Sequence, residues 1–231
     1  MSGAKPLGVV CVSGGMDSCV TAALAARTHR LAFLHANYGQ RTEEKELACF
    51  RLLAAHFAAE HTLVVDFTAL SAIGGSSLTD RAIAVREGEP VDGVVPTSYV
   101  PFRNAHLLSA ATSWAEVLGA SAIFVGAVWE DSSGYPDCRP EFYRAFGEAI
   151  RLGTRPETEI AIETPVIAMT KAEIVSTGRD LGAPFEKTWS CYQASDAACG
   201  VCESCRLRLR GFAEAGAADP LPYARPSSVR D

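Results

Sequence analysis

The chain has 231 residues, of which 48% are hydrophobic and 21% are charged, and its formal net charge at pH 7 is −6; this fits one soluble domain, or one domain with an appendage. The acidic balance argues against the basic face that nucleic-acid-binding proteins usually carry, so we expect a small-molecule substrate and no nucleic acid partner. Because no apolar run approaches the ~18 residues of a membrane helix, and residues 1–7 lack the layout of a signal peptide, we expect no membrane contact and a cytoplasmic location.

Strand and helix patterns alternate along most of the chain. In chain order they predict a strand at 7–13, a helix at 17–28, a strand at 30–36, a helix at 42–59, a strand at 61–67, an irregular segment at 70–101, a helix at 104–118, a strand at 121–127, a helix at 140–151, a strand at 159–166 and a helix at 171–181. Thr170 and Glu173 form a capping-box pattern at the start of the last helix. This alternation predicts an α/β fold with a Rossmann-like, doubly wound parallel sheet.

Four of the eight cysteines lie close together late in the chain. They are Cys191, Cys199, Cys202 and Cys205. Their spacing suits a tetrahedral zinc ion, which would be structural because four thiolates leave no open coordination position. An iron–sulfur cluster also takes four cysteines and stays an alternative. We therefore expect a nucleotide-binding and catalytic domain at 1–188, followed by a small zinc-binding lobe and its tail at 189–231.

The segment VSGGMDS at 12–18 directly follows the first predicted strand and opens the first predicted helix. Adjacent glycines let the backbone turn sharply, and the free N–H groups of a helix start attract anions. Asp17 could hold Mg²⁺ or cap the helix, and Ser13 and Ser18 can donate to phosphate oxygens. The string lacks the Gly-Lys-Ser/Thr of a Walker loop and resembles the PP-loop of ATP pyrophosphatases. The predicted ATP-binding residues are Val12, Ser13, Gly14, Gly15, Met16, Asp17, Ser18 and Cys19.

Two further segments are candidates for the substrate side of the site. DSSGYPDCRPEF at 131–142 lies just past the fourth predicted strand, and open α/β sheets bind ligands at the carboxyl ends of their strands. Its glycine, proline and aspartate would also suit a plain turn. YVPFRNAHLL at 99–108 begins a predicted helix with Arg103 and Asn104, and an arginine at a helix start suits an anion.

Over nearly its whole length the chain resembles the QueC family of 7-cyano-7-deazaguanine synthases, which are PP-loop enzymes of the queuosine pathway. The strings that carry the resemblance are SGGMDS, YGQRTEEKEL, YVPFRNAHLLS, SGYPDCRPEF, TKAEIV, TWSCY, CGVCESCRLR and AGAADPLPY. The loop at 192–198, YQASDAA, departs from the family pattern because it lacks an expected glycine and proline.

The resemblance implies a ligase that converts 7-carboxy-7-deazaguanine and ammonia to 7-cyano-7-deazaguanine, with ATP, Mg²⁺ and Zn²⁺ as cofactors. A carboxylate is a poor electrophile, so its oxygen must first take AMP from ATP. Ammonia then gives an amide, whose oxygen is adenylated in turn before the nitrile forms. Asp17, Ser18 and Lys171 are the expected catalytic residues, although Lys171 could simply begin its helix.

The expected substrate contacts also follow from the resemblance. Asp137 would accept hydrogen bonds from the guanine-like N–H pair, and Tyr135 would stack on the base. Arg139 or Arg103 would face the substrate carboxylate. Asn104 is also expected to contact the substrate.

Three other functions remain compatible with the sequence. A nucleotide-binding module without catalysis would leave the 131–142 segment unexplained. A tRNA-thiolating PP-loop enzyme would need a basic surface and a redox-active cysteine. A relative of the same fold could pass the adenylated acid to another amine. The sequence leaves the oligomeric state open, a homodimer included.

Overall fold

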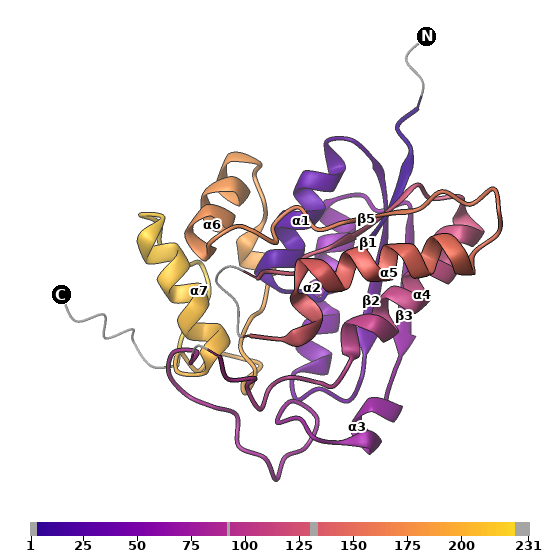
Figure 1. Cartoon of the computed structure of the whole chain (residues 1–231). Coiled ribbons are helices and arrows are strands. Elements are labelled where there is room, and N and C mark those ends of the chain that lie inside the picture. Colours follow the sequence, from indigo (N-terminus) through magenta and orange to yellow (C-terminus); the bar gives the residue numbers. More distant parts are fainter. Residues whose placement is uncertain (1–3, 92, 130–133, 225–231) are drawn as a thin grey trace.

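A parallel sheet forms the centre of the protein in this computed structural model, which describes residues 4–91, 93–129 and 134–224 (Figure 1). Within these residues the sheet has five strands in the order β3-β2-β1-β4-β5. The strands are β1 (Leu7–Cys11), β2 (Arg30–Asn37), β3 (His61–Asp66), β4 (Ala122–Val125) and β5 (Ala161–Glu163). Because the order reverses direction between β1 and β4, the carboxyl ends of these two strands form the crevice where such sheets bind ligands.

The inner strands are short and apolar because both of their faces are covered. Every residue of β1 and β4 is buried, as expected for the centre of a parallel sheet. Val9 of β1 pairs with Ala32 of β2 on one side and with Ile123 of β4 on the other. The edge strands β3 and β5 keep exposed positions.

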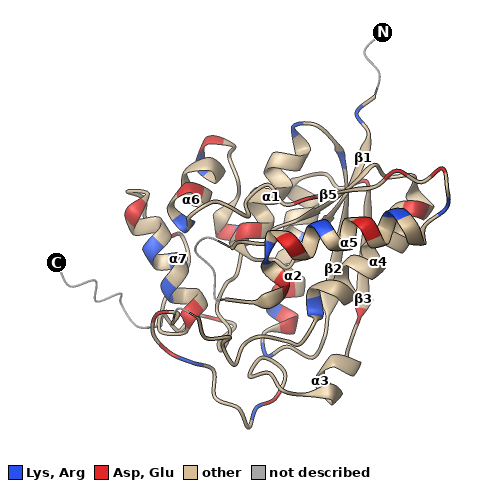
Figure 2. Ribbon diagram, in the orientation of Figure 1, with Lys and Arg blue, Asp and Glu red and all other residues tan. Residues whose placement is uncertain are grey.

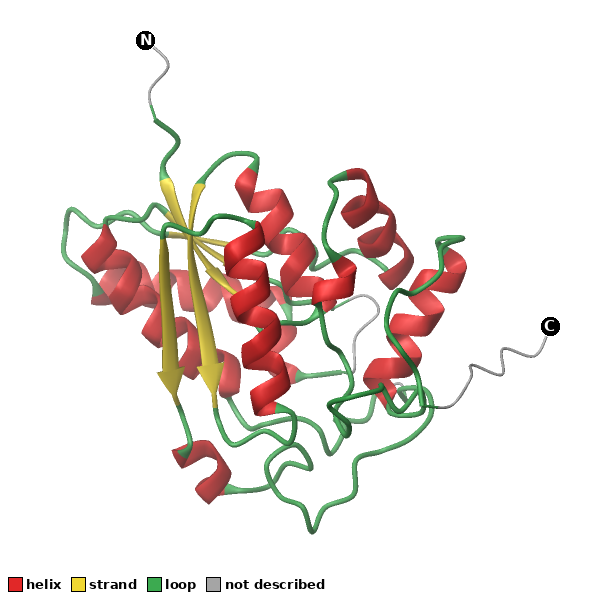
Figure 3. Ribbon diagram, turned by 180° about the vertical axis from the view of Figure 1, so that it is seen from behind, coloured by secondary structure: helices red, strands yellow, loops and turns green. Residues whose placement is uncertain are grey.

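Helices cover both faces of the sheet. The helices of the described residues are α1 (Met16–Ala26), α2 (Glu43–His56), α3 (Ala69–Ile73), α4 (Arg103–Leu118), α5 (Pro140–Gly153), α6 (Lys171–Asp180) and α7 (Glu203–Glu214), with short 3₁₀ helices η1 (Pro136–Cys138) and η2 (Phe185–Lys187). Helices α1 and α2 pack on one face, and α4 and α5 pack on the other. Figure 3 shows the strands between these layers, with their arrowheads directed toward the long loops that form the site.

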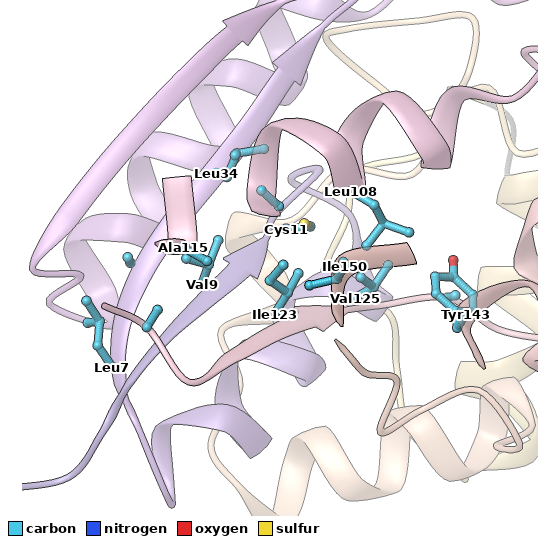
Figure 4. Packing of buried hydrophobic residues seen from close by; sticks show 14 of the residues in the cluster. Leu7, Val9, Cys11, Leu34, Leu108, Ala115, Ile123, Val125, Tyr143 and Ile150 are labelled. Carbon is cyan, nitrogen blue, oxygen red and sulfur yellow. The ribbon is translucent and has the colours of Figure 1, made fainter. Parts of the chain in front are cut away.

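The core between the sheet and helices α4 and α5 is drawn in Figure 4. Val9 and Ile123 point from the sheet toward Leu108 of α4 and Ile150 of α5, and all four side chains are buried. Val10, the next residue along β1, points to the opposite face and packs with residues of α1 and α2. This alternation anchors β1 from both sides and fixes the place where the following loop begins.

Helix α5 lies on the surface and is amphipathic. Its outer face carries charges of alternating sign, which Figure 2 shows as red and blue bands. These charged residues are Glu141, Arg144, Glu148 and Arg151, and all four are exposed. None of the helices in the described ranges combines the length and the apolar composition that a membrane span requires.

Helices α6 and α7 pack against each other beside α1. Gly211 of α7 permits the close approach, because a Cβ there would lie 2.6 Å from Cβ of Lys171. The predicted capping box is confirmed: Thr170 Oγ1 accepts from the N–H of Glu173, whose carboxylate accepts from the N–H of Thr170. The start of α6, and with it Lys171, is therefore fixed.

The predicted order of strands and helices is confirmed, with two differences. The last strand, predicted at 159–166, is reduced to the three residues of β5, which lies at the sheet edge and pairs with β4 alone. The segment 70–101, predicted to be irregular, includes the last residues of α3 and an antiparallel bridge between Glu87 and Cys202. This bridge links the long loop to the cysteine-rich segment.

The chain after residue 188 returns to the centre of the molecule. The backbone N–H of Trp189 donates to the carbonyl oxygen of Gly14 at 2.8 Å. Residues 225–231 of the predicted tail lie outside the described residues. The cysteine-rich segment is thus hydrogen-bonded to the loop that follows β1.

Candidate functional site

The loop after β1 turns sharply, as its two glycines predict. Gly14 has a φ of +88°, and a Cβ there would lie 2.6 Å from the carbonyl oxygen of Glu46, so a larger residue would be strained and crowded. Ser13 Oγ accepts from the N–H of Gly15 at 3.2 Å and lies 3.2 Å from Ser18 Oγ. Two hydroxyls, one from the loop and one from the first turn of α1, thus lie together at the helix start, an arrangement suited to the oxygens of a pyrophosphate group.

The end of β4 packs directly against this loop. A Cβ at Gly126 would lie 2.8 Å from the backbone nitrogen of Ser18 and 3.0 Å from the carbonyl carbon of Asp17. A side chain at position 126 would therefore push the loop out of place. The glycine keeps the carboxyl ends of β1 and β4 in contact at the crevice.

An ion pair joins the start of α1 to the start of α6. Lys171 Nζ donates to Asp17 Oδ2 at 2.7 Å, and the lysine side chain is 9% exposed. The other oxygen, Asp17 Oδ1, is buried without a hydrogen-bond partner. A free carboxylate oxygen beside an anion-binding loop is a suitable ligand for Mg²⁺.

Two cavities open at this edge of the sheet. The larger, of about 210 Å³, is lined by Ser13, Gly15, Met16, Asp17, Ser18, Tyr38, Glu46, Arg103, Gly126, Ala127, Val128, Tyr135, Cys138, Lys171, Trp189, Ser190, Tyr192, Ser204, Leu207 and Arg208. The smaller, of about 140 Å³, is lined by Cys11, Val12, Ser13, Ser18, Leu34, Ala36, Tyr38, Glu46, Arg103, Asn104, Leu107, Val125, Gly126, Ala127, Cys138 and Tyr143. Because the two cavities share several lining residues, they are neighbouring parts of one site. The larger part carries most of the charges, whereas the smaller is lined mainly by apolar strand ends.

Aromatic side chains and a guanidinium group form another part of the wall of the larger cavity. Arg103 donates to Tyr38 Oη at 3.0 Å and lies over the same ring. Burial raises the pKa of Tyr38 to about 12, so the phenol stays protonated at neutral pH. Tyr135 Oη donates to Ser98 Oγ at 3.0 Å and lies 3.4 Å from Tyr192 Oη.

The segment predicted to bind substrate is divided by the structure into buried and exposed parts; its first residues, 131–133, lie outside the described residues. Tyr135 lines the larger cavity, whereas Asp137 is buried but does not line either cavity. Asp137 Oδ2 instead accepts from the N–H of Asn104 at 2.9 Å and caps α4. Arg139 is exposed and its Nε donates to the carbonyl oxygen of Pro136.

Cys138 lines both cavities. Burial raises the pKa of its thiol to about 12. The thiol therefore stays protonated at neutral pH, and its environment does not activate it as a nucleophile.

The predicted PP-loop residues do not all face the cavities. Five of them line the larger one: Ser13, Gly15, Met16, Asp17 and Ser18. Val12 lines the smaller one. Gly14 lies against the backbone of α2, and Cys19 is buried in the core between the sheet and α1.

The four clustered cysteines form a metal-binding group. Their Sγ atoms all lie within 4.8 Å of one another, and those of Cys199 and Cys205 are 3.9 Å apart. A tetrahedral zinc ion with bonds of ~2.3 Å would hold its sulfurs about 3.8 Å apart. Backbone N–H groups of Gln193 and Ala194 donate to Cys191 Sγ at 3.4 and 3.3 Å, which favours a thiolate. The donor set fits a metal ion held by four thiolates.

Several cavity residues have no counterpart in the predicted site. They are Tyr38, Glu46, Trp189, Ser190, Tyr192 and Arg208, together with small or apolar neighbours. Most of them lie in strings that carried the family resemblance, namely YGQRTEEKEL, TWSCY and CGVCESCRLR. The resemblance was thus a signal for these segments, but the spacing of residues within them gave no reason to place their side chains in a common site.

The chain is similar in sequence to known proteins over most of its length. A family model described as "Queuosine biosynthesis protein QueC" matches residues 7–216. A 7-cyano-7-deazaguanine synthase of Chlorobaculum tepidum is 58% identical over 224 residues, which cover 96% of this chain and 99% of the relative. A protein of the same name from Koribacter versatilis is 56% identical over 220 residues, covering 94% of this chain and 92% of the relative.

A solved structure shares the fold at low sequence identity. The U34-tRNA thiolase NcsA from Methanococcus maripaludis, with its 4Fe-4S cluster, superposes with a TM-score of 0.50 at 13% identity. The match covers 83% of this chain and 62% of that chain. It confirms the predicted α/β architecture.

Proposed function

Because the chain belongs to the QueC family of queuosine biosynthesis proteins, we propose that it is a 7-cyano-7-deazaguanine synthase, an ATP-dependent enzyme that forms carbon–nitrogen bonds. The observation that carries this proposal is identity of 58% to a protein of that name over 96% of the chain. The PP-loop residues that line a charged cavity agree with ATP as the activating substrate.

The reaction requires two activations of the same carbon atom. An oxygen of 7-carboxy-7-deazaguanine attacks the α-phosphorus of ATP, pyrophosphate leaves, and an acyl adenylate forms. Ammonia displaces AMP to give the amide. The amide oxygen then attacks the α-phosphorus of a second ATP, and pyrophosphate leaves again. Loss of AMP and of both protons from nitrogen yields the nitrile. Both rounds need one geometry, with the substrate oxygen in line with the α-phosphorus and pyrophosphate held opposite.

The residues of the PP-loop would hold the departing pyrophosphate. Hydroxyls of Ser13 and Ser18 and the N–H groups at the start of α1 donate to its oxygens, and Lys171 adds positive charge from α6. Asp17 would keep Lys171 oriented through its Oδ2 while Oδ1 stays free for Mg²⁺. When bound there, Mg²⁺ would neutralise charge on the phosphate oxygens.

The part of the cavity lined by aromatic side chains and Arg103 is the proposed place for the deazaguanine. Tyr135, which lines the larger cavity, is the proposed contact of the ring, and Arg103 is the proposed partner for an oxygen of the substrate. Arg103 is preferred to Arg139 for this role because Arg139 is exposed outside both cavities. We propose zinc for the four-cysteine group, in a role confined to folding, since all four positions of the ion are taken by protein.

Mass spectrometry of the products tests the proposed function. The protein is incubated with ATP, 7-carboxy-7-deazaguanine and ¹⁵N-labelled ammonium, and we expect AMP and the labelled nitrile. In parallel incubations, a conjugate formed with an added amine in place of the nitrile would point to the related transferase, and sulfur incorporated into added tRNA in the presence of a sulfur donor would point to a thiolase. Absence of any AMP release with this substrate would reject the proposal.

A further inference from the structure

The carboxylate of Glu46 faces the site but has no part in the proposed catalysis. Among the described residues that line the two cavities, the carboxylates are Asp17 and Glu46. Asp17 is bound to Lys171 beside the PP-loop. Glu46 lines both cavities, next to Tyr38 and Arg103.

Two neighbouring side chains hold the Glu46 carboxylate in a fixed orientation. Thr42 Oγ1 donates to Oε1 at 2.7 Å, and Gln40 Nε2 donates to Oε2 at 3.2 Å. Gln40 is itself fixed, because its Oε1 accepts from the N–H of Tyr38 at 2.8 Å. Both supporting side chains are buried. The carboxylate is therefore oriented before a ligand enters.

Glu46 still has room for two more hydrogen bonds. A carboxylate offers about four acceptor positions, and Thr42 and Gln40 use one on each oxygen. One position on each oxygen thus remains for a donor. Burial raises the pKa of Glu46, so a ligand that supplies two donors would favour the ionised form.

A guanine-type ring presents the complementary set of groups on one edge. Its ring N–H and exocyclic amino group are adjacent donors, and a carbonyl oxygen follows them. Glu46 supplies the pair of acceptors. The guanidinium of Arg103 at the start of α4, whose charge acts on Glu46, supplies donors for the carbonyl oxygen. Adenine offers a lone pair where guanine has its ring N–H, so a fixed carboxylate would repel adenine there.

From this arrangement we propose that Glu46 is the specificity-determining residue that reads the N–H pair of the deazaguanine ring, with Arg103 beside it on the carbonyl oxygen. The inference rests on the proposed function. Glu46 thus takes the role that the sequence suggested for Asp137. Asp137 Oδ2 accepts from the N–H of Asn104, and its side chain does not line either cavity.

The test is a comparison of steady-state kinetics with 7-carboxy-7-deazaguanine and ATP varied separately. Glu46→Gln keeps the size of the side chain but replaces one acceptor by a donor. We expect its KM for the deazaguanine to rise roughly 10- to 100-fold, the cost of an unmatched charged hydrogen bond, with little change in the KM for ATP. Glu44→Gln, the same substitution at an exposed position of the same helix, should match wild type.

A substrate analogue without the exocyclic amino group gives a second readout that a general loss of structure would not produce. Wild type should bind this analogue roughly tenfold or more weakly than the natural acid, and Glu46→Gln should lose most of that discrimination. Thermal unfolding checks that the variant is folded. If it is not, Glu46→Asp takes its place, and loss of the discrimination in that folded variant carries the test.

Several results would overturn the inference. These are a normal deazaguanine KM in folded Glu46→Gln, a rise confined to the KM for ATP, a rise in Asp137→Asn but not in Glu46→Gln, or equal binding of the analogue by wild type. If wild type forms no nitrile at all, the proposed function fails and the inference falls with it. Nitrile formation by wild type with unchanged kinetics in Glu46→Gln rejects the inference alone.

Discussion

Single side chains around the PP-loop are oriented by other protein groups and do not depend on a ligand for their positions. Asp17 illustrates this, because one carboxylate oxygen is bound to Lys171 and the other is left without a partner. Preorganised groups of this kind lower the cost of reaching a charged transition state. Catalysis should therefore be sensitive to changes at Asp17 that leave its shape intact.

We expect Asp17→Asn to lower kcat by at least ~10²-fold, the scale of a lost electrostatic contribution to a transition state. The amide keeps the size of the side chain but cannot bind Mg²⁺ as well and no longer neutralises Lys171. The measurement is the rate of AMP release at saturating substrates, with Asp180→Asn at the exposed end of α6 as the control. A folded Asp17→Asn protein that turns over at the wild-type rate would refute the proposed role.

Sequence reasoning reached the PP-loop residues because their signal is local. A strand, two glycines and a helix start follow one another, and backbone physics then dictates an anion-binding turn. It did not place Glu46 or Arg208 in the cavity, since each is delivered by a helix whose position depends on packing far away in sequence. Arg208, for example, reaches the cavity while its guanidinium is bound to Asp219.

At the scale of elements, the start of α6 sets the position of a charged side chain. The capping box at Thr170 satisfies N–H groups that would otherwise lack partners, and Lys171 is the next residue. This part of the site was predictable from sequence, because the Thr-x-x-Glu pattern is a short-range signal. The reduction of the last strand to β5 was not, since the extent of pairing at a sheet edge depends on its neighbour.

We expect Thr170→Ala to lower the free energy of unfolding by about 1 kcal/mol, the usual cost of a lost N-cap. Turnover should fall as well, because the first turn of α6 carries Lys171. Denaturant unfolding and AMP release measure the two effects. Thr68→Ala is a matched control, because Thr68 stands at the N-cap of α3 without a side-chain capping bond. Equal loss of stability in both variants would contradict the role of the capping box.

At the scale of the whole molecule, the two ends of the sequence build one site. Trp189 is hydrogen-bonded to Gly14 of the PP-loop, and Ser204, Leu207 and Arg208 of α7 line the larger cavity. Helix α7 begins at Glu203, between the metal-binding residues Cys202 and Cys205. A metal ion at the four cysteines would therefore support one wall of the larger cavity, the proposed site of ATP.

We expect about one zinc ion per chain, and we expect its removal by a chelator to weaken ATP binding as well as loosen the cysteine-rich segment. Elemental analysis, ATP titration and hydrogen exchange measure the three quantities, and re-addition of zinc should restore all of them. Exchange that increases at 189–214 while ATP affinity stays unchanged would show that the wall does not depend on the metal. Iron with visible absorbance would assign the group to the iron–sulfur class instead.

All five strands run in the same direction, so their carboxyl ends lie at one edge of the sheet and their amino ends at the other. The candidate site lies at the carboxyl edge. Side chains that line the cavities follow the carboxyl ends of the strands, whereas the amino ends are joined by short turns such as 27–29 and 119–121. Thr28 is exposed in the first of these turns, and the native cysteines of the described residues are buried or belong to the metal-binding group. A thiol introduced at Thr28 would thus be a selective handle, through which the enzyme could be immobilised on a support with the mouth of its site turned toward the solution.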